Sequence, residues 1–205
     1  MARLTRTQSR QQTRERLLDA ARDAFTREGY AGASVDVIAE RAGFSKGAFY
    51  SNFESKEAIF LELLEAHMGE EVAISSGFAP QNASAEDAIE AIAARYASDP
   101  VDLEWCLLSI EFALHATRSP AFAERRAALF ARHYAAVAKI IDAIAASAGT
   151  RIAEPERAAA VFIALRQGLA LERSQTMPAI SSADVQRALS RWMLGLVGLA
   201  DRPSA

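Results

Sequence analysis

The chain has 205 residues, enough to bury a core in one large domain or in a small domain followed by a larger one. A single cysteine excludes an internal disulfide framework, and no apolar run approaches the roughly 20 residues that span a bilayer. Apolar residues make up 51% of the chain, and ten Gly and six Pro interrupt them only rarely. This composition predicts an all-α protein of the cytoplasm that does not enter a membrane.

Positive charge is concentrated near the N-terminus, although the net charge of the whole chain is −3. Residues 1–57 contain ten Lys and Arg against eight Asp and Glu, whereas residues 58–205 contain thirteen against eighteen. The first four arginines recur at intervals of three and four residues, as Arg3, Arg6, Arg10 and Arg14. On one face of a helix such a stripe can lie along DNA phosphates. The alternative interpretation is a solvated N-terminal tail.

Helical segments separated by caps and glycines fill the first third of the chain. Apolar residues recur with a helical period over residues 13–28. Ser34 supplies an N-cap for a short helix, and Ser45 supplies another only two residues after Gly43, which allows a tight turn. Ser55 caps a longer helix that is expected to run to about residue 76. The sequence therefore predicts two short helices joined by a glycine turn and flanked by longer ones.

Five further helices are predicted in the rest of the chain. A stretch rich in Ser, Gly and Pro reads as a loop over residues 75–84. Prolines and serines then mark helix starts, and Gly149 marks a helix end. The expected helices cover about 85–98, a segment from Pro100, about 120–148, about 155–174, and a last segment that ends near Leu199.

The paired short helices have the arrangement of a helix-turn-helix, in which the second helix enters the major groove and the first braces it. Donors suited to phosphates and base edges lie on or beside them, and Gly47 permits a close approach. Phe49 and Phe53 are expected to face inward as packing. The candidate DNA-binding residues are Ser34, Ser45, Lys46, Gly47, Tyr50, Asn52 and Lys56.

The run SVDVIAERAGFSKGAFYSNFESKEAIF resembles the DNA-binding domain of the tetracycline-repressor (TetR) family, and the resemblance is specific over roughly residues 14–64. The chain departs from the family pattern at Ser34, usually a threonine, at Ala48, often a hydroxyl residue, and at Asn52, often a histidine. These departures leave the individual base contacts and the target sequence open. The matching positions are Phe25, Gly29, Ile38, Ala39, Ala42, Gly43, Ser45, Gly47, Tyr50, Phe53, Lys56 and Glu57.

The resemblance implies a subunit of about nine helices that dimerises through its last two helices and binds a near-palindromic operator. It implies a helix-turn-helix domain over residues 1–56 and a larger helical domain for ligand binding and dimerisation over 57–205. Residues 157–171, small or apolar around Gly168, permit such an interface, as does a stripe on the last helix formed by Trp192, Leu194, Leu196 and Val197. The alternative is that both helices pack into the core of a single subunit.

Aromatic and polar residues of the middle helices can line an apolar pocket with a few polar contacts. The candidate ligand-binding residues are Tyr96, Trp105, Phe112, His115, His133 and Tyr134. The corresponding hypothesis is a repressor that blocks a promoter and is released by a small lipophilic effector. Aromatic residues at helical spacing also form ordinary cores, so a filled interior would favour an architectural or activating DNA binder without an effector.

Neither catalysis nor a metal or cofactor is expected. Glu111, His115 and Arg118 can imitate an acid–base cluster, but three such side chains on one helix face are usually solvated, and no nucleophile motif or phosphate loop accompanies them. Cys106 lies in an apolar run, where a buried, inert thiol is expected and an oxidant sensor is the alternative. A helical enzyme or ligand carrier with an incidental N-terminal domain is the remaining rival.

Overall fold

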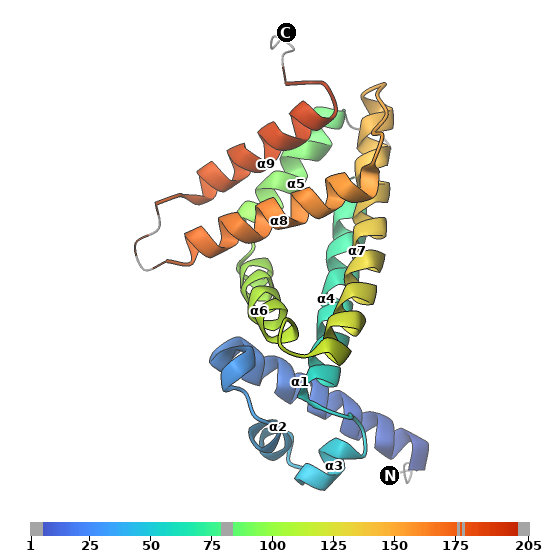
Figure 1. Cartoon of the computed structure of the whole chain (residues 1–205), viewed down its shortest axis with the longest axis vertical. Helices are drawn as coiled ribbons and strands as arrows, with labels where there is room; N and C mark the ends of the chain where they lie inside the picture. The colour runs from blue at the N-terminus through green and yellow to red at the C-terminus, as the bar shows by residue number, and fades with distance from the viewer. Residues whose placement is uncertain (1–5, 79–83, 176, 178, 201–205) are drawn as a thin grey trace, which may run out of the picture. The chain divides into compact units, whose positions relative to one another are not determined.

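The computed structural model describes residues 6–78, 84–175, 177 and 179–200 of the chain. This described part consists of nine α-helices joined by short connections and contains no strand, which confirms the all-α prediction (Figure 1). The helices are α1 (Arg6–Gly32), α2 (Val35–Arg41), α3 (Lys46–Tyr50), α4 (Lys56–Gly77), α5 (Ala85–Ser98), α6 (Pro100–Ala116), α7 (Pro120–Ser147), α8 (Pro155–Arg173) and α9 (Ser182–Leu196).

The helix boundaries differ from the predicted ones at three places. Helix α1 begins at Arg6 instead of near residue 13, and α9 ends at Leu196 instead of near Leu199. Helix α4 runs to Gly77, into the predicted loop, of which residues 79–83 lie outside the described part of the chain. The apolar period of a sequence predicts which face of a helix is buried better than it predicts where the helix begins and ends, because the end residues contribute little to that face.

The predicted serine caps are present. The side-chain oxygen of Ser34 accepts a hydrogen bond from the backbone N–H of Val37, and that of Ser45 accepts one from Ala48, both at 3.2 Å. Ser55 caps α4 in the same way, with its Oγ 3.1 Å from the backbone N of Ala58. These bonds satisfy N–H groups that have no partner inside the helix, and they fix where each helix begins.

The chain forms two compact units. Unit 1 comprises residues 1–67 and 108–126, and unit 2 comprises residues 68–107 and 127–205. The described residues of the segment 1–56, predicted as a DNA-binding domain, all belong to unit 1.

An aromatic cluster forms the core of unit 1. The ring of Phe60 on α4 lies 5.0 Å from the rings of Phe25 and Tyr30 and 4.7 Å from that of Phe112 on α6, measured between centroids. Phe25, Phe60 and Phe112 are fully buried. Edge-to-face pairs at such distances add to the gain from burying the rings, so this cluster anchors α1 to its neighbours in unit 1.

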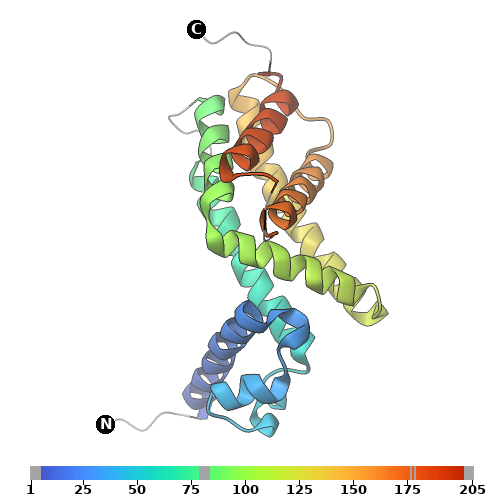
Figure 2. The same ribbon diagram turned by 90° about the vertical axis from the view of Figure 1, so that its left-hand side faces the viewer.

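The core of unit 2 is built from small and branched apolar side chains. Helix α9 packs against both α5 and α8, and Figure 2 shows these three helices side by side in green, orange and red. Ile89, Ile144 and Leu189 are completely buried in this core. Among the described residues, we find no helix of the length and apolarity that a membrane span requires.

Candidate nucleic-acid interface

A glycine turn joins α2 to α3. Gly43 has φ +75°, a conformation that side chains disfavour, and its N–H donates to the carbonyl of Glu40 at 2.9 Å. The next N–H, of Phe44, donates to the carbonyl of Ala39 at 2.9 Å. Both bonds close the C-terminal end of α2 before Ser45 opens α3. The two helices therefore form the predicted helix-turn-helix.

Helix α3 exposes most of its residues. Phe49 is fully buried in unit 1, whereas Tyr50 is 51% exposed and packs its ring edge-on against that of Phe49, 5.4 Å away. A Cβ added to Gly47 would meet nothing closer than 3.7 Å, so no internal contact requires a glycine there. The outer face of α3 thus combines an aromatic hydroxyl with a position open to close approach.

Lys46, the first residue of α3, is held at the surface by α2. Its ammonium lies 2.9 Å from a carboxylate oxygen of Asp36, and more than half of the lysine side chain is exposed. The bond to Asp36 and the charge of that carboxylate raise the pKa of Lys46, so the ammonium keeps its proton. The pair is exposed to water and exchangeable, which leaves the cation able to reach a phosphate.

Asn52, predicted to contact DNA, is turned back toward the protein. Its Nδ2 donates to the carbonyl of Ala48 at 2.9 Å, and its side chain is only partly exposed. Within the described residues, its Oδ1 has no hydrogen-bond partner. The amide therefore closes the C-terminal end of α3, with one acceptor left over.

Two arginines of α1 hold the end of α3, a role that sequence reasoning missed. Arg10 donates to the carbonyl of Ser51 at 3.3 Å, and Arg14 donates to the carbonyl of Asn52 at 2.7 Å. The guanidinium of Arg14 also lies 4.2 Å above the ring of Phe53. The helical spacing correctly predicted a shared face for Arg10 and Arg14, but only the fold shows that this face meets the carbonyls that end α3. Arg3, the first arginine of the predicted stripe, lies outside the described residues.

Arg14 also forms an ion pair with Glu62 of α4. One side chain of α1 thus bonds the residues that end α3 and a carboxylate of α4.

Lys56 also has a bracing role. Its Nζ donates to the carbonyls of Tyr30 and Ala33, at 2.8 and 2.9 Å, and lies 4.5 Å above the ring of Tyr30. Burial lowers the pKa of Lys56, against the opposing charge of Glu57. Two of its three N–H groups are therefore used to tie the α1–α2 connection to the start of α4. Contact of the third with DNA remains a prediction.

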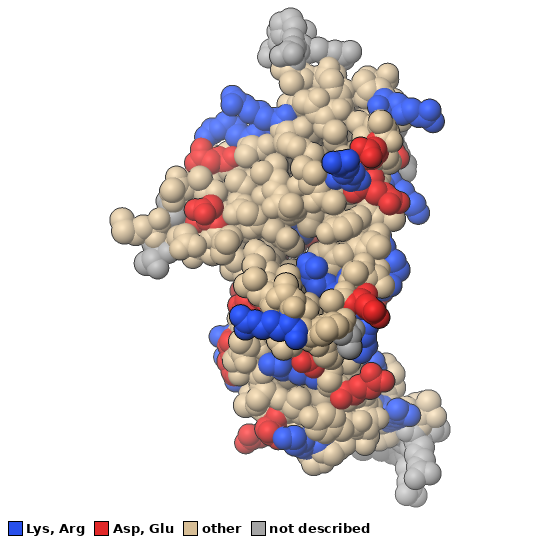
Figure 3. All heavy atoms as spheres, in the orientation of Figure 1, with Lys and Arg blue, Asp and Glu red and all other residues tan. Residues whose placement is uncertain are grey.

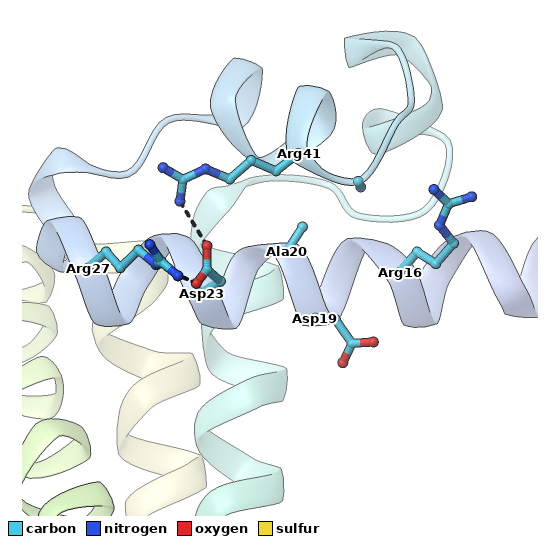
Figure 4. A pocket seen from close by; sticks show the side chains of 7 residues that line it. Arg16, Asp19, Ala20, Asp23, Arg27 and Arg41 are labelled. Carbon is cyan, nitrogen blue, oxygen red and sulfur yellow. Dashed lines mark hydrogen bonds and ion pairs between the residues drawn. The ribbon is translucent and has the colours of Figure 1, made fainter.

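Charged side chains of both signs are intermingled on the face of the molecule drawn in Figure 3. Unit 1 has a surface hollow of about 520 Å³ whose lining is also of mixed charge. In Figure 4, Arg27 and Arg41 both reach Asp23, at 2.6 and 3.2 Å, whereas Asp19 points away from α2. This hollow is thus partly occupied by ion pairs, of which the Asp23–Arg41 pair links α1 to α2.

The six predicted ligand-binding residues divide between the two units. Phe112 and His115 lie in unit 1, where Phe112 belongs to the aromatic cluster and His115 Nε2 lies 3.2 Å from a carboxylate oxygen of Glu57. Burial would raise the pKa of Glu57, but hydrogen bonds from its own backbone, Ser55 and His115 outweigh burial and lower it. The residues in unit 2 are Tyr96, Trp105, His133 and Tyr134.

Two small hollows adjoin Tyr96 in unit 2, with volumes of about 10 and 20 Å³. Each has room for about one water molecule. The first has both charged and apolar residues in its lining, which consists of Tyr96, Asp102, Leu103, Cys106, Arg166, Ala170, Arg173 and Val185. The second is mainly apolar and is lined by Val72, Ser75, Ile92, Tyr96, Val137, Ile140, Ile141, Phe162 and Met193. Trp105, His133 and Tyr134 line neither hollow.

A buried ionic network surrounds the first hollow, and the sequence pattern did not predict it. Glu71 accepts hydrogen bonds from Arg166 and from the hydroxyl of Tyr96, both at 2.6 Å, and Glu71 and Arg166 are almost completely buried. Asp102 pairs with Arg95 at 3.0 Å. Burial alone would raise the pKa of Glu71, but the charges of Arg166 and His133 and the bond from Tyr96 lower it.

His133 and Cys106 are buried in the same unit. Both ring nitrogens of His133 lack a hydrogen-bond partner among the described residues, and burial lowers its pKa. Cys106 is 4% exposed, and burial raises the pKa of its thiol, which confirms the predicted buried cysteine. Glu111 and His115 of α6 do not form an acid–base cluster with each other. Glu111 accepts a hydrogen bond from the backbone N–H of Tyr30, whereas His115 pairs with Glu57.

Comparison with protein families agrees with this geometry. Residues 17–63 match the family described as bacterial regulatory proteins, tetR family, and residues 83–198 match the one described as BetI-type transcriptional repressor, C-terminal. The chain belongs to the TetR family. It is therefore a DNA-binding transcriptional regulator, and its family is one of regulators and not of enzymes.

Individual relatives of this TetR-family regulator match over only part of their length. The transcriptional activator FasR of Mycolicibacterium smegmatis is 42% identical over 59 residues, which cover 29% of this chain and 27% of the relative. The transcriptional repressor AcnR of Corynebacterium efficiens is 28% identical over 113 residues, 54% of each chain. The matches thus span less than two thirds of these relatives.

A solved structure shares the whole fold. The structure of a TetR-family regulator from Mesorhizobium loti superposes with a TM-score of 0.72 at 23% identity, covering 96% of this chain and 98% of that one. At this identity the likeness establishes the fold alone.

Proposed function

We propose that this regulator is a repressor that occupies a near-palindromic operator as a homodimer and is released when a small effector binds unit 2. The observation that carries the DNA-binding half is the outer face of α3. It presents Lys46, Gly47 and Tyr50 outward from a helix that Phe49 anchors in the core. A helix exposed in this way can enter a major groove of DNA. We place the regulator and its operator in the bacterial cytoplasm.

The last two helices support the proposed dimer. On α8, Val161 is 46% exposed and Leu171 is 43% exposed, although both are apolar. A Cβ added to Gly168 or Gly195 would have no neighbour within 4 Å, so neither glycine serves close packing inside this chain. Exposed apolar residues on α8, together with the open glycines of α8 and α9, suit a four-helix interface with a second copy, although Val197 of the predicted stripe on the last helix is buried in the core of its own subunit.

A second candidate function is an activator that needs no effector. The two hollows beside Tyr96 are small in this structure, which favours a DNA binder whose interior stays filled. One relative is named an activator and another a repressor, so family membership leaves the sign of regulation open. The buried charges of unit 2 favour the effector-controlled regulator, because ionic groups are costly to bury and often mark functional sites.

The DNA-binding proposal is tested by fluorescence anisotropy against fragments that flank the regulator's own gene, over a range of salt concentrations. We expect saturable, salt-sensitive binding to one fragment, and weaker binding by the double variant Lys46→Ala, Tyr50→Ala. Lys139→Ala, which removes an exposed cation from α7, serves as the control and should bind like the parent. Equal, weak binding of every fragment by parent and double variant would contradict the proposal.

Dimerisation is tested by analytical ultracentrifugation. We expect the parent to sediment as a dimer and Gly195→Leu to shift the equilibrium toward monomer, because its added side chain enters the interface. Gly69→Leu, at a position of α4 that is equally open within the chain, is the matched control. A monomeric parent, or a fully dimeric Gly195→Leu variant, would argue against an interface on α9.

A further inference from the structure

The charged side chains at the first hollow of unit 2 do not balance. Three arginines and two carboxylates either line this hollow or pair with side chains that do, which leaves one positive charge over. They are Arg95, Arg166, Arg173, Glu71 and Asp102. Arg166 is buried, whereas Arg173 is only partly buried, so the excess positive charge lies at the edge of a buried ionic network, where it attracts a counter-ion of the opposite sign. A singly charged anion would neutralise this network.

Arg166 has donor capacity that the fold does not use. Its side chain is 10% exposed, and it donates to Glu71 through Nη1. Its Nε–H has no partner in the part of the chain that the structure describes. The guanidinium lies 4.5 Å above the ring of Tyr96, and this contact and the bond to Glu71 together fix its orientation. A fixed guanidinium edge offers two parallel N–H donors, the geometry that matches the two oxygens of a carboxylate.

We propose that the effector is a small organic monocarboxylate whose carboxylate binds the unused edge of Arg166. This inference rests on the proposed function, since it assigns a chemical class to the effector of the same unit. Arg173 supplies a second cation at the same hollow. There its guanidinium is positioned by a bond to the carbonyl of Ala97.

The remaining lining selects among carboxylates. Asp102 also lines the hollow, and its negative charge opposes dianions such as dicarboxylates and phosphate. Tyr96 lines both hollows, and the second is walled by branched apolar side chains, including Val72, Ile92 and Ile140. The first hollow has apolar lining of its own in Leu103, Ala170 and Val185, which a short hydrocarbon group attached to the carboxylate can contact. Because each hollow has room for about one water molecule in this structure, the site has to widen when the acid binds, and an acid of few carbons requires the least widening.

The proposal is tested by isothermal titration calorimetry of the full chain with acetate, butyrate and hexanoate, each beside its primary amide. We expect saturable binding of at least one acid and none of the matching amide, which has the same shape without the charge. Arg166→Lys keeps a cation beside Glu71 but loses the two-donor edge, and should bind about 10- to 100-fold more weakly. Arg157→Lys, at the exposed start of α8, is the matched control and should bind like the parent.

A second measurement keeps the test decisive if Arg166→Lys does not fold. In the parent, the Nε–H resonance of Arg166 should move on titration with the bound acid and should stay in place with the amide. Binding of acid and amide with equal affinity, an Arg166→Lys variant that folds and binds like the parent, or a fixed Arg166 resonance during saturable binding would overturn the proposal.

Anisotropy on the same preparations separates this inference from the proposed function. Operator binding without binding of any of the three acids would reject the carboxylate and leave the regulator intact. If an acid binds but the protein binds no DNA fragment specifically, the proposed function is rejected and the carboxylate site is retained. Acid binding that leaves operator affinity unchanged would reject the acid as effector, because an effector must bind the free and DNA-bound forms with different affinities.

Discussion

A carboxylate oxygen of Glu111, on α6, lies 2.8 Å from the backbone nitrogen of Tyr30 and accepts its hydrogen bond. The bond lies at the kink of α1, directly after Gly29, whose backbone has φ 71° and ψ 171°. At a helix kink a backbone N–H loses its helical partner, and here a side chain distant in sequence replaces it. Glu111 and Gly29 therefore act together to set the direction of the last turn of α1.

We expect Gly29→Ala to destabilise unit 1 by about 1–3 kcal/mol, since this backbone region is open almost only to glycine. The new Cβ would also lie 2.9 Å from the Glu111 carboxylate. Gly69→Ala, in the regular and open part of α4, is the control and should stabilise by about 0.5–1 kcal/mol. Chemical denaturation measures both. A Gly29→Ala variant as stable as the parent would show that the kink is not required.

Arg14→Met should weaken operator binding without changing its dependence on salt. Arg14 forms a hydrogen bond with a residue that ends α3, the proposed recognition helix. Its loss therefore loosens α3 but removes no phosphate contact. When a residue that does bind phosphate is replaced, the slope of log K against log salt falls by about 0.9 for each phosphate no longer neutralised. Arg22→Met, at an exposed position of the same helix, is the control. A lowered slope for Arg14→Met would instead place Arg14 on the DNA.

Lys46→Met and Lys56→Met should distinguish a lysine that contacts DNA from a lysine that stabilises the fold. For Lys56→Met we expect a loss of about 1–3 kcal/mol in stability, because the carbonyls of Tyr30 and Ala33 lose a charged donor. For Lys46→Met we expect nearly unchanged stability and a smaller salt dependence of operator binding. Thermal unfolding and anisotropy, applied to both variants, check the two expectations. The reverse pattern would exchange the assigned roles.

Asp102 should make the stability of unit 2 decrease as pH rises from about 4 to about 6. Burial and the negative charge of Glu71 raise its pKa from 3.8 to about 6, against the opposing effect of Arg95. Between these two values the folded state holds a proton that the unfolded state has lost, so the folded state loses stability with rising pH. Relative to Asp102→Asn, the parent should lose about 1–3 kcal/mol over this range. A difference that is constant with pH, measured by urea unfolding, would contradict the raised pKa.

Local features of the sequence predicted the helices well. Ser34, Ser45 and Ser55 mark helix starts because a capping oxygen acts within three residues of its own position. Gly43 marks the turn for an equally local reason, its backbone conformation. The fold class and the position of α3, the second helix of the helix-turn-helix, were predictable from such signals together with the family resemblance.

Long-range pairing accounts for what the sequence did not reveal. Glu71 and Arg166 are 95 residues apart, and neither position breaks the helical pattern around it, so no local signal pairs them. Arg14 and Lys56 carry the charges expected of DNA-binding residues, but their partners are backbone carbonyls that only the folded chain brings near. Phe112 looked like a pocket residue because buried aromatic rings have the same spacing whether they line a pocket or fill a core.

The recognition helix has only five residues, Lys46–Tyr50, and Phe49 is the one buried among them. So short a helix is unstable alone, and it owes its conformation to the cap at Ser45 and to the arginines of α1 that hold its end. The side chains proposed to contact DNA are therefore different from those that maintain the helix. Under the proposed function, substitutions at the exposed positions would redirect the regulator to new operators at little cost in stability, and a duplicated copy of the gene would have an open route to new targets.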